Sequence, residues 1–203
     1  MTAELTLAVV PVQRLGQAKS RLAGELTPDE RRRLVLEVLT HVLSELREAS
    51  FVSATLVVTP DETVATEALT GGAEVLRQPA DVPGLNQAIR LAQAEATRRG
   101  ASALLVVHGD LPLLKAGEID EMVELAPAPI GIVTAPDRHR RGTNALLLRP
   151  PGIIEPHFGV DSLRLHQEAA HLRGIAQREY QVPGFAFDLD TAADLAALAE
   201  SRR

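Results

Sequence analysis

The sequence predicts an α/β protein, a three-layer sandwich in which a mostly parallel sheet lies between two layers of helices. Short apolar runs such as residues 5–12 and 103–107 alternate along the chain with longer amphipathic segments. Strands that are apolar throughout are buried on both faces, as happens when crossover helices cover a parallel sheet. No repeat, low-complexity stretch or linker interrupts the 203 residues, so we expect a single domain over 1–203.

The helix expected after the first strand has the clearest boundary signal. Thr27 and Glu30 form a capping box with Pro28 at the first helical position, and the helical pattern continues to about Glu48. The same alternation gives the other elements in order. We expect strands at residues 5–12, 52–58, 74–76, 103–107, 130–134, 144–148 and 185–189, and helices at residues 61–69, 85–98, 115–125, 163–172 and from 191 onward.

The composition argues against several classes of function. Acidic residues outnumber basic ones by 27 to 21 and aromatic residues make up only 2%, so a nucleic-acid partner is not expected. No stretch approaches the roughly 18 apolar residues of a membrane span, and the first residues lack the pattern of a signal peptide, so we expect a cytoplasmic protein. The absence of cysteine excludes disulfides and sulfur-based zinc sites. A homo-oligomer is neither indicated nor excluded.

An aspartate follows the apolar run at residues 103–107. In the sequence HGDLPLL, Asp110 lies just beyond the carboxyl end of this predicted strand. Ligands of parallel α/β sheets bind outside the carboxyl ends of the strands, so Asp110 is a candidate ligand-binding residue. An equally simple interpretation is that it caps the helix after Pro112 or stabilises a turn.

Two further carboxylates occur in the sequence GFAFDLD near the end of the chain. In a strand over 185–189, Asp188 and Asp190 would lie on one face. Anions this close repel each other unless a cation compensates, and oxygen ligands suit Mg²⁺ better than zinc. Alternatively, Asp190 caps the final helix, where Thr191 and Asp194 also form a capping pattern.

A basic loop follows the first predicted strand. Arg14, Lys19 and Arg21 occur there with no acid between them, and Lys19 and Lys115 are the only lysines of the chain. Such a loop at the carboxyl edge of the sheet could hold phosphates, although it lacks the spacing of a phosphate-binding P-loop. A solvated loop is the alternative.

The remaining polar motifs give weaker signals. None of the six histidines has the spacing of a metal-binding pair, so we interpret them as surface or packing residues, and no nucleophile elbow is present. Residues 31–33, all arginine, are expected to form a solvated helix face. The basic segment at residues 137–142 is either a solvated loop or an attractant for an acidic ligand.

Several motifs together resemble one enzyme family. The segments PVQRLGQAKSRL, PGLNQAI, GDLPLL, GTNALLLRP, FGVDS and FDLDTAADL occur in the order and spacing found in the guanylyltransferases of deazaflavin coenzyme F-420 biosynthesis. These enzymes join GMP to phosphoenolpyruvate in bacteria or to 2-phospho-L-lactate in archaea. The resemblance covers essentially the whole chain, and it implies the glycosyltransferase-A-like nucleotidyltransferase fold.

The resemblance also implies a role for individual residues. The metal carboxylates, for Mg²⁺, would be Asp110, Asp188 and Asp190. GTP would be held by Lys19 and Arg21 in the basic loop and by the turn from Gly84 to Asn86. The phosphorylated three-carbon acid would be held by Thr143, Gly159 and Ser162. One departure is Gln13, where the family often has lysine.

The residues themselves leave alternatives open on the acceptor side. The segments around Thr143 and Gly159 could be ordinary turns, and Ser162 could cap the following helix, which would itself create an anion site.

The sequence thus predicts a guanylyltransferase that transfers GMP from GTP to phosphoenolpyruvate and releases pyrophosphate. The acceptor could instead be 2-phospho-L-lactate or 3-phosphoglycerate, which differ little from it. Another nucleotidyltransferase, such as the molybdenum-cofactor type, is the nearest alternative. A non-catalytic nucleotide-sensing domain is the alternative from a different class.

Overall fold

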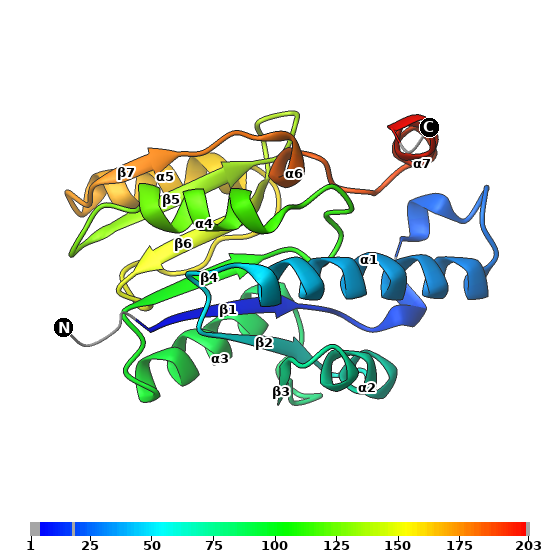
Figure 1. The fold of residues 1–203 in the computed structure, drawn as a ribbon, viewed down its shortest axis with the longest axis horizontal. Helices are drawn as coiled ribbons and strands as arrows, with labels where there is room; N and C mark the ends of the chain where they lie inside the picture. Colours follow the sequence, from blue (N-terminus) through cyan, green and yellow to red (C-terminus); the bar gives the residue numbers. More distant parts are fainter. Residues whose placement is uncertain (1–4, 18, 202–203) are drawn as a thin grey trace.

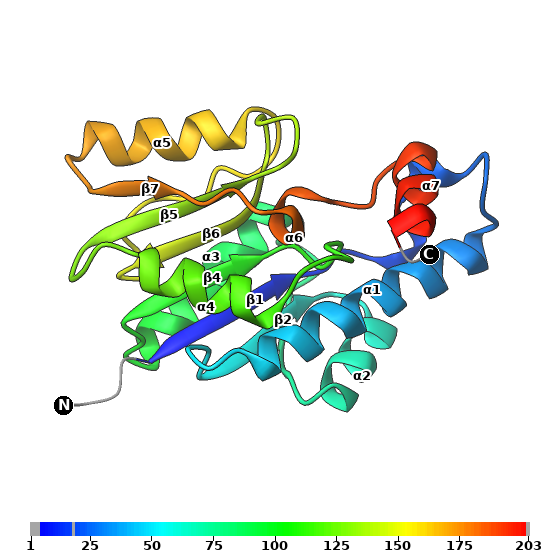
Figure 2. The same cartoon turned by 45° about the horizontal axis from the view of Figure 1, so that its top comes forward.

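The computed structural model describes residues 5–17 and 19–201. They form a seven-stranded sheet with the strand order β3-β2-β1-β4-β6-β5-β7. Helices cover both faces, so the predicted α/β sandwich is confirmed (Figures 1 and 2). The strands are β1 (Thr6–Pro11), β2 (Ala54–Thr59), β3 (Glu74–Arg77), β4 (Ala103–Val107), β5 (Gly131–Pro136), β6 (Thr143–Arg149) and β7 (Gln177–Glu179).

The helices occupy nearly the predicted positions, except α6 and the 3-10 helices, which were not predicted. They are α1 (Pro28–Glu48), α2 (Glu62–Thr70), α3 (Leu85–Arg98), α4 (Ala116–Leu125), α5 (Ser162–Leu172), α6 (Pro183–Ala186) and α7 (Ala192–Ser201), together with the short 3-10 helices η1 (Leu15–Gln17) and η2 (Ser20–Leu22). The capping box of α1 is confirmed, because the Thr27 hydroxyl accepts a hydrogen bond from Glu30 N and the Glu30 carboxylate accepts one from Thr27 N. No described helix is both long enough and apolar enough to span a bilayer.

Most neighbouring strands are parallel. β1 is parallel to both β2 and β4, and β3 is parallel to β2. β6 is antiparallel to β4 and β5, while β7 is parallel to β5. The carboxyl ends of the first four strands therefore lie along one edge of the sheet, where the loops at residues 12–22 and 108–114 begin.

The side chains of β1 show how the two layers of helices are held. Val10 packs in one core with Leu39 of α1, on the face that α1, α2 and α4 cover. Its neighbour Val9 packs on the opposite face with Ile89 of α3, and α5 contributes to that second core. All four side chains are fully buried, and each burial contributes about 2 kcal/mol relative to exposure.

The strand predicted at residues 185–189 is wrong. Pro183 begins the short helix α6 instead, and the following residues leave it as a loop. The sheet edge beside β5 is occupied by β7, which the sequence did not predict. Leu189 N donates to the backbone oxygen of Asp110 at 3.1 Å, so this loop lies against the loop that follows β4.

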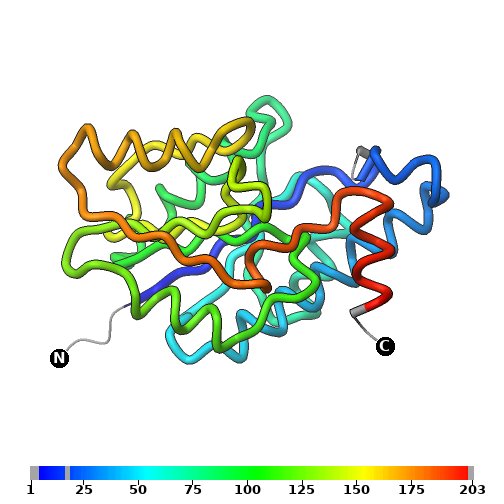
Figure 3. Tube along the Cα trace, turned by 90° about the horizontal axis from the view of Figure 1, so that it is seen from above, coloured from blue at the N-terminus to red at the C-terminus, as the bar shows by residue number. Residues whose placement is uncertain are grey.

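The C-terminal helix α7 lies beside the loop at residues 19–27 and the N-terminal half of α1 (Figures 2 and 3). Leu198 of α7 packs with Val38 of α1 and with Leu189 in a small separate core. This packing fixes the segment that carries Asp188 and Asp190 over the carboxyl edge of the sheet.

Candidate active site

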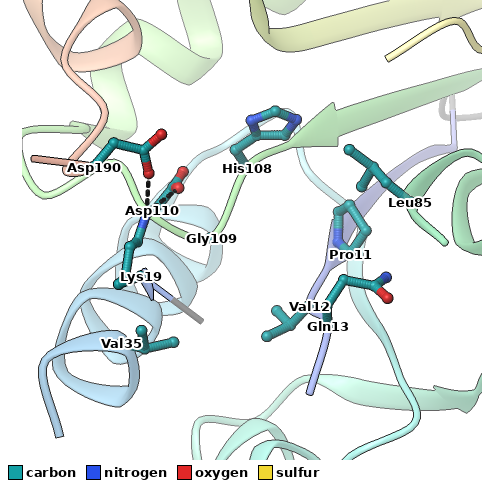
Figure 4. A pocket seen from close by; sticks show the side chains of 10 residues that line it. All are labelled: Pro11, Val12, Gln13, Lys19, Val35, Leu85, His108, Gly109, Asp110 and Asp190. Atoms are coloured by element: carbon teal, nitrogen blue, oxygen red, sulfur yellow. Dashed lines mark hydrogen bonds and ion pairs between the residues drawn. The ribbon is translucent and has the colours of Figure 1, made fainter. Parts of the chain in front are cut away.

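A pocket of about 280 Å³ opens at the carboxyl edge of the sheet, between the ends of β1 and β4 (Figure 4). Its lining combines apolar side chains from both layers with a group of charged side chains at one side. The lining residues are Pro11, Val12, Gln13, Lys19, Val35, Leu85, His108, Gly109, Asp110 and Asp190.

The ammonium group of Lys19 joins two carboxylates from distant parts of the chain. Lys19 Nζ lies 2.5 Å from Asp110 Oδ2 and 2.7 Å from Asp190 Oδ1, and the lysine side chain is only 9% exposed. Its backbone is in the left-handed region (φ 53°, ψ 40°), which is costly for a residue with a Cβ atom. The predicted convergence of Asp110 and Asp190 is therefore present, with a lysine between them.

The charges of this cluster shift one another's pKa values. Burial alone would lower the pKa of Lys19, but the two carboxylates outweigh it and raise the pKa. Burial would likewise raise the pKa of Asp110, but the charge of Lys19 outweighs it and lowers the pKa. Both groups are therefore charged at neutral pH.

For Asp188, the third predicted carboxylate, no cation outweighs the effect of burial on the pKa. Burial, together with the charge of Asp110, raises the pKa of Asp188. The second carboxylate oxygen of Asp110, Oδ1, is buried and has no hydrogen-bond partner. Over residues 5–17 and 19–201, no three acidic or histidine side chains already surround one point as metal ligands. The cluster thus has unsatisfied negative charge and an unused oxygen.

Capping roles do not explain these carboxylates. Thr191 and Asp194 cap α7, because Asp194 Oδ2 accepts hydrogen bonds from the backbone N–H groups of Asp190 and Thr191, and the Thr191 hydroxyl accepts one from Asp194 N. The side chain of Asp190 is left to contact Lys19. Asp110 does not cap α4 either, since that helix begins after Lys115.

The predicted nucleotide-binding residues lie along the same edge. Arg21 is 73% exposed, and its guanidinium is 3.5 Å from Asp190 Oδ2. Gln13 lines the main pocket and also a second pocket of about 170 Å³, which Arg14 and Gln78 line as well. Gly84, with φ 101°, directly precedes α3 and could not be replaced by a residue with a side chain without strain.

The predicted acceptor-binding residues divide into a buried pair and an exposed glycine. Ser162 Oγ accepts a hydrogen bond from Thr143 N at 2.8 Å, and both residues are 1% exposed. Ser162 therefore does not cap α5, whose N-cap is Asp161. Gly159 is exposed and has φ 124°, so it forms the tip of this loop.

Two histidines have more specific positions than the sequence suggested. His108 lines the pocket, where burial lowers its pKa, and its Nε2 is buried without a partner. His166 on α5 is fully buried beside Thr143. The position of His108 two residues before Asp110, at the end of a predicted strand, was an available signal. His108 was not predicted as a site residue because it lacks the spacing of a metal-binding histidine pair.

The comparison with known families is decisive. Residues 6–199 match the family model described as "Guanylyl transferase CofC like". The chain belongs to this family. A "Phosphoenolpyruvate guanylyltransferase" of Sphaerobacter thermophilus is 54% identical over 194 residues, which cover 96% of this chain and 92% of the relative. One of Rubrobacter xylanophilus with the same name is 44% identical, with coverage of 96% and 93%.

Solved structures show the same nucleotidyltransferase fold for this CofC-like guanylyl transferase. A 4-diphosphocytidyl-2C-methyl-D-erythritol synthase matches with a TM-score of 0.67 at 15% identity, covering 100% of both chains. A glucosyl-3-phosphoglycerate synthase from Mycobacterium tuberculosis, in complex with Mg²⁺ and uridine diphosphate, matches with a TM-score of 0.59 at 14% identity, covering 88% of this chain and 70% of the other. The predicted family, fold and enzyme class are confirmed.

Proposed function

We propose that this guanylyl transferase transfers GMP from GTP to phosphoenolpyruvate, with release of pyrophosphate, in deazaflavin coenzyme F-420 biosynthesis. The names of its relatives support the acceptor and the nucleotide. The observation that carries the proposal is the cluster of Lys19, Asp110 and Asp190 at a pocket on the carboxyl edge of the sheet. Phosphates bind at this edge in parallel α/β folds.

The reaction requires alignment and charge neutralisation more than proton transfer. A phosphate oxygen of phosphoenolpyruvate forms a bond to the α-phosphorus of GTP, and the bond to the bridging oxygen of the β-phosphate breaks. Pyrophosphate leaves with that electron pair. Because the attacking phosphate is already ionised at neutral pH, no strong general base is needed, and the enzyme holds the reactants in line.

Basic side chains would hold the triphosphate. Lys19 offers a buried ammonium group at the pocket wall, and Arg21 offers an exposed guanidinium nearby. Gln13 occupies the position where the family often has lysine, so phosphate charge in this loop depends on Lys19 and Arg21. The turn from Gly84 to the start of α3 would lie near the base.

The residues at the site fit a divalent cation. Asp110, Asp188 and Asp190 supply only oxygen ligands, which Mg²⁺ prefers, and Asp110 Oδ1 is a buried oxygen without a partner. Lys19 now neutralises part of the charge of Asp110 and Asp190, and it would have to share these two carboxylates with the cation or leave them. A bound Mg²⁺ would neutralise charge on the phosphates and make the α-phosphorus more electrophilic. The neighbouring fold with Mg²⁺ and uridine diphosphate supports this assignment.

The acceptor would bind beside the loop at residues 157–162, which adjoins the pocket through His108. Ser162 is buried at the end of this loop, where it contacts the buried Thr143, so only Gly159 of the three predicted residues is exposed. Backbone N–H groups next to a glycine can approach a phosphate closely. We therefore assign Thr143 and Ser162 to the support of the acceptor loop.

A reaction screen tests the proposal. The purified enzyme is incubated with Mg²⁺, one nucleoside triphosphate and one acceptor at a time, and pyrophosphate release is measured. We expect release with GTP and phosphoenolpyruvate, and far slower release with ATP or CTP. Faster turnover with 2-phospho-L-lactate or 3-phosphoglycerate would identify that acid as the acceptor in place of phosphoenolpyruvate. GTP binding without pyrophosphate release from any acceptor would contradict the enzyme assignment.

A further inference from the structure

Asn86 is engaged in a way that its predicted role at the nucleotide does not explain. It lies in the first turn of α3, yet both ends of its amide are bonded to one residue of a distant loop. Asn86 Nδ2 donates to the backbone oxygen of Phe158 at 3.0 Å, and Asn86 Oδ1 accepts from Phe158 N at 2.8 Å. These two hydrogen bonds fix the orientation of the amide and hold the Phe158 backbone.

A second side chain holds the preceding residue of the same loop from the other side. His157 N donates to His166 Nε2 at 3.1 Å. Burial, aided by the charges of His157 and His108, lowers the pKa of His166 to about 3, so the ring is neutral. The hydrogen therefore sits on Nδ1, which faces the Thr143 hydroxyl at 3.1 Å.

The hydrogen bonds of Asn86 to Phe158 and of His166 to His157 together form a clamp on the loop. The ring of Phe158 connects this clamp to the pocket. It lies 5.4 Å from the ring of His108, which lines the pocket, and 4.8 Å from the ring of His166. The next residue, Gly159, is exposed at the loop tip, and its oxygen accepts a hydrogen bond from Ser162 N. The loop tip therefore takes its position from the two clamped residues before it.

We propose that Asn86 and His166 are positioning residues for the acceptor. They fix the backbone of residues 157 and 158, and so place the turn at residues 159–162 beside the pocket. Asn86 thus serves the acceptor although it lies on the helix next to the nucleotide, and replacing it changes acceptor binding rather than guanine recognition. This inference rests on the proposed function.

The same helix provides a matched control. Gln93 of α3 donates to the backbone oxygens of Pro151 at 2.9 Å and Ile154 at 3.0 Å, so it also clamps the connection between β6 and α5. Its contacts, at Pro151 and Ile154, lie further along the chain from Gly159 than residues 157 and 158 do, and Gln93 does not line the pocket. A purely structural effect of lost clamping should therefore appear equally in a Gln93→Met variant.

The test compares KM values for the two substrates, measured by pyrophosphate release. Asn86→Ala removes both hydrogen bonds, and we expect it to raise the KM for phosphoenolpyruvate about tenfold while the KM for GTP stays within about twofold. Gln93→Met should lower the melting temperature at least as much and leave both KM values unchanged. His166→Phe should raise the same KM, and His166→Gln, which can still accept from His157 N, should restore it.

The outcomes separate the inference from the proposed function. A raised KM for GTP with an unchanged KM for phosphoenolpyruvate would mean that Asn86 reads the nucleotide, and would overturn the inference. Equal KM effects in Asn86→Ala and Gln93→Met would overturn it as well, because the clamp would then be structural only. If the unmodified enzyme releases no pyrophosphate with phosphoenolpyruvate and GTP, the proposed function fails and the inference fails with it.

Discussion

Two polar clusters adjoin the pocket and differ in how well their groups are satisfied. The charged cluster around Lys19 brings two carboxylates to one ammonium group and leaves Asp110 Oδ1 without a partner. The neutral cluster around His166 pairs its ring nitrogens, and Ser162 accepts from the backbone of Thr143. Unsatisfied charge marks a surface that receives a ligand, whereas satisfied neutral groups give a loop its shape.

This difference predicts opposite consequences when a residue is replaced. In the charged cluster, replacement should reduce the rate while the fold stays intact. In the neutral cluster, it should reduce stability, because a buried partner loses its hydrogen bond. The following variants test the comparison, from the largest expected effect to the smallest.

Asp110→Asn should have the largest effect. The change removes a preorganised charge at the pocket, and we expect the rate of pyrophosphate release to fall by about 10²-fold or more. The measurement is turnover at saturating GTP and phosphoenolpyruvate, with circular dichroism to verify folding. Asp29→Asn is the matched control, because Asp29 is 79% exposed on α1 and is not among the residues that line the pocket. Normal turnover in Asp110→Asn would mean that the charged cluster is not catalytic.

Ser162→Ala should destabilise the neutral cluster. Removing the hydroxyl leaves Thr143 N buried without its acceptor, which costs about 1–3 kcal/mol of unfolding free energy. Urea denaturation measures this loss. Ser102→Ala is the control, because the oxygen of Leu5 that accepts from the Ser102 hydroxyl also accepts from Ser102 N. Equal stability of the two variants would contradict the role assigned to the neutral cluster.

Asp188→Asn should increase stability while it reduces activity. The raised pKa of Asp188 means that its charged form is disfavoured in the folded state. A raised pKa stabilises the fold below the pKa of the unfolded chain, and this contribution is lost as pH rises through the folded value. Removing the charge should therefore raise the melting temperature at pH 7.

The pH dependence of that gain provides the control. The difference in melting temperature between Asp188→Asn and the unmodified enzyme should shrink as pH falls below the ordinary range of aspartate. A gain that is constant with pH would indicate a packing effect instead.

Arg21→Gln should have the smallest effect. Its guanidinium is mostly exposed and lies 3.5 Å from Asp190, so it contributes little to stability. We expect an unchanged melting temperature and an increase of about two- to threefold in the KM for GTP. This increase should become smaller at high salt, because salt screens the charge of an exposed guanidinium. A larger effect on phosphoenolpyruvate than on GTP would place Arg21 on the acceptor side.

Most of the fold was predictable because local signals determine it. The apolar runs of the central strands are long enough to be recognised, and the capping box at Thr27 marks the start of α1 without tertiary information. The short strand β7 was missed because the residues Gln177–Glu179 are polar and pair only along the sheet edge. The segment 185–189 alternates like a strand, but Pro183 begins a helix and the sheet edge beside β5 is occupied by β7.

The site was predictable in its members more than in its arrangement. Position at a strand end pointed to Asp110, an alternating pattern pointed to Asp190, and the basic loop pointed to Lys19. No local pattern shows that the lysine lies between the two acids. The clamp is equally non-local, because Asn86 and Phe158 are 72 residues apart and their contact depends on how α3 and the loop pack.

The central claim is that Asp110, Asp188 and Asp190 bind a divalent cation that handles the nucleotide. Crystals of the enzyme with Mn²⁺ and a GTP analogue that does not react would locate the cation by anomalous scattering. We expect a peak contacting oxygens of these three carboxylates, with Lys19 moved from between Asp110 and Asp190 toward the phosphates. A nucleotide bound at the pocket with no peak there, and with Lys19 still joining the two carboxylates, would contradict the claim.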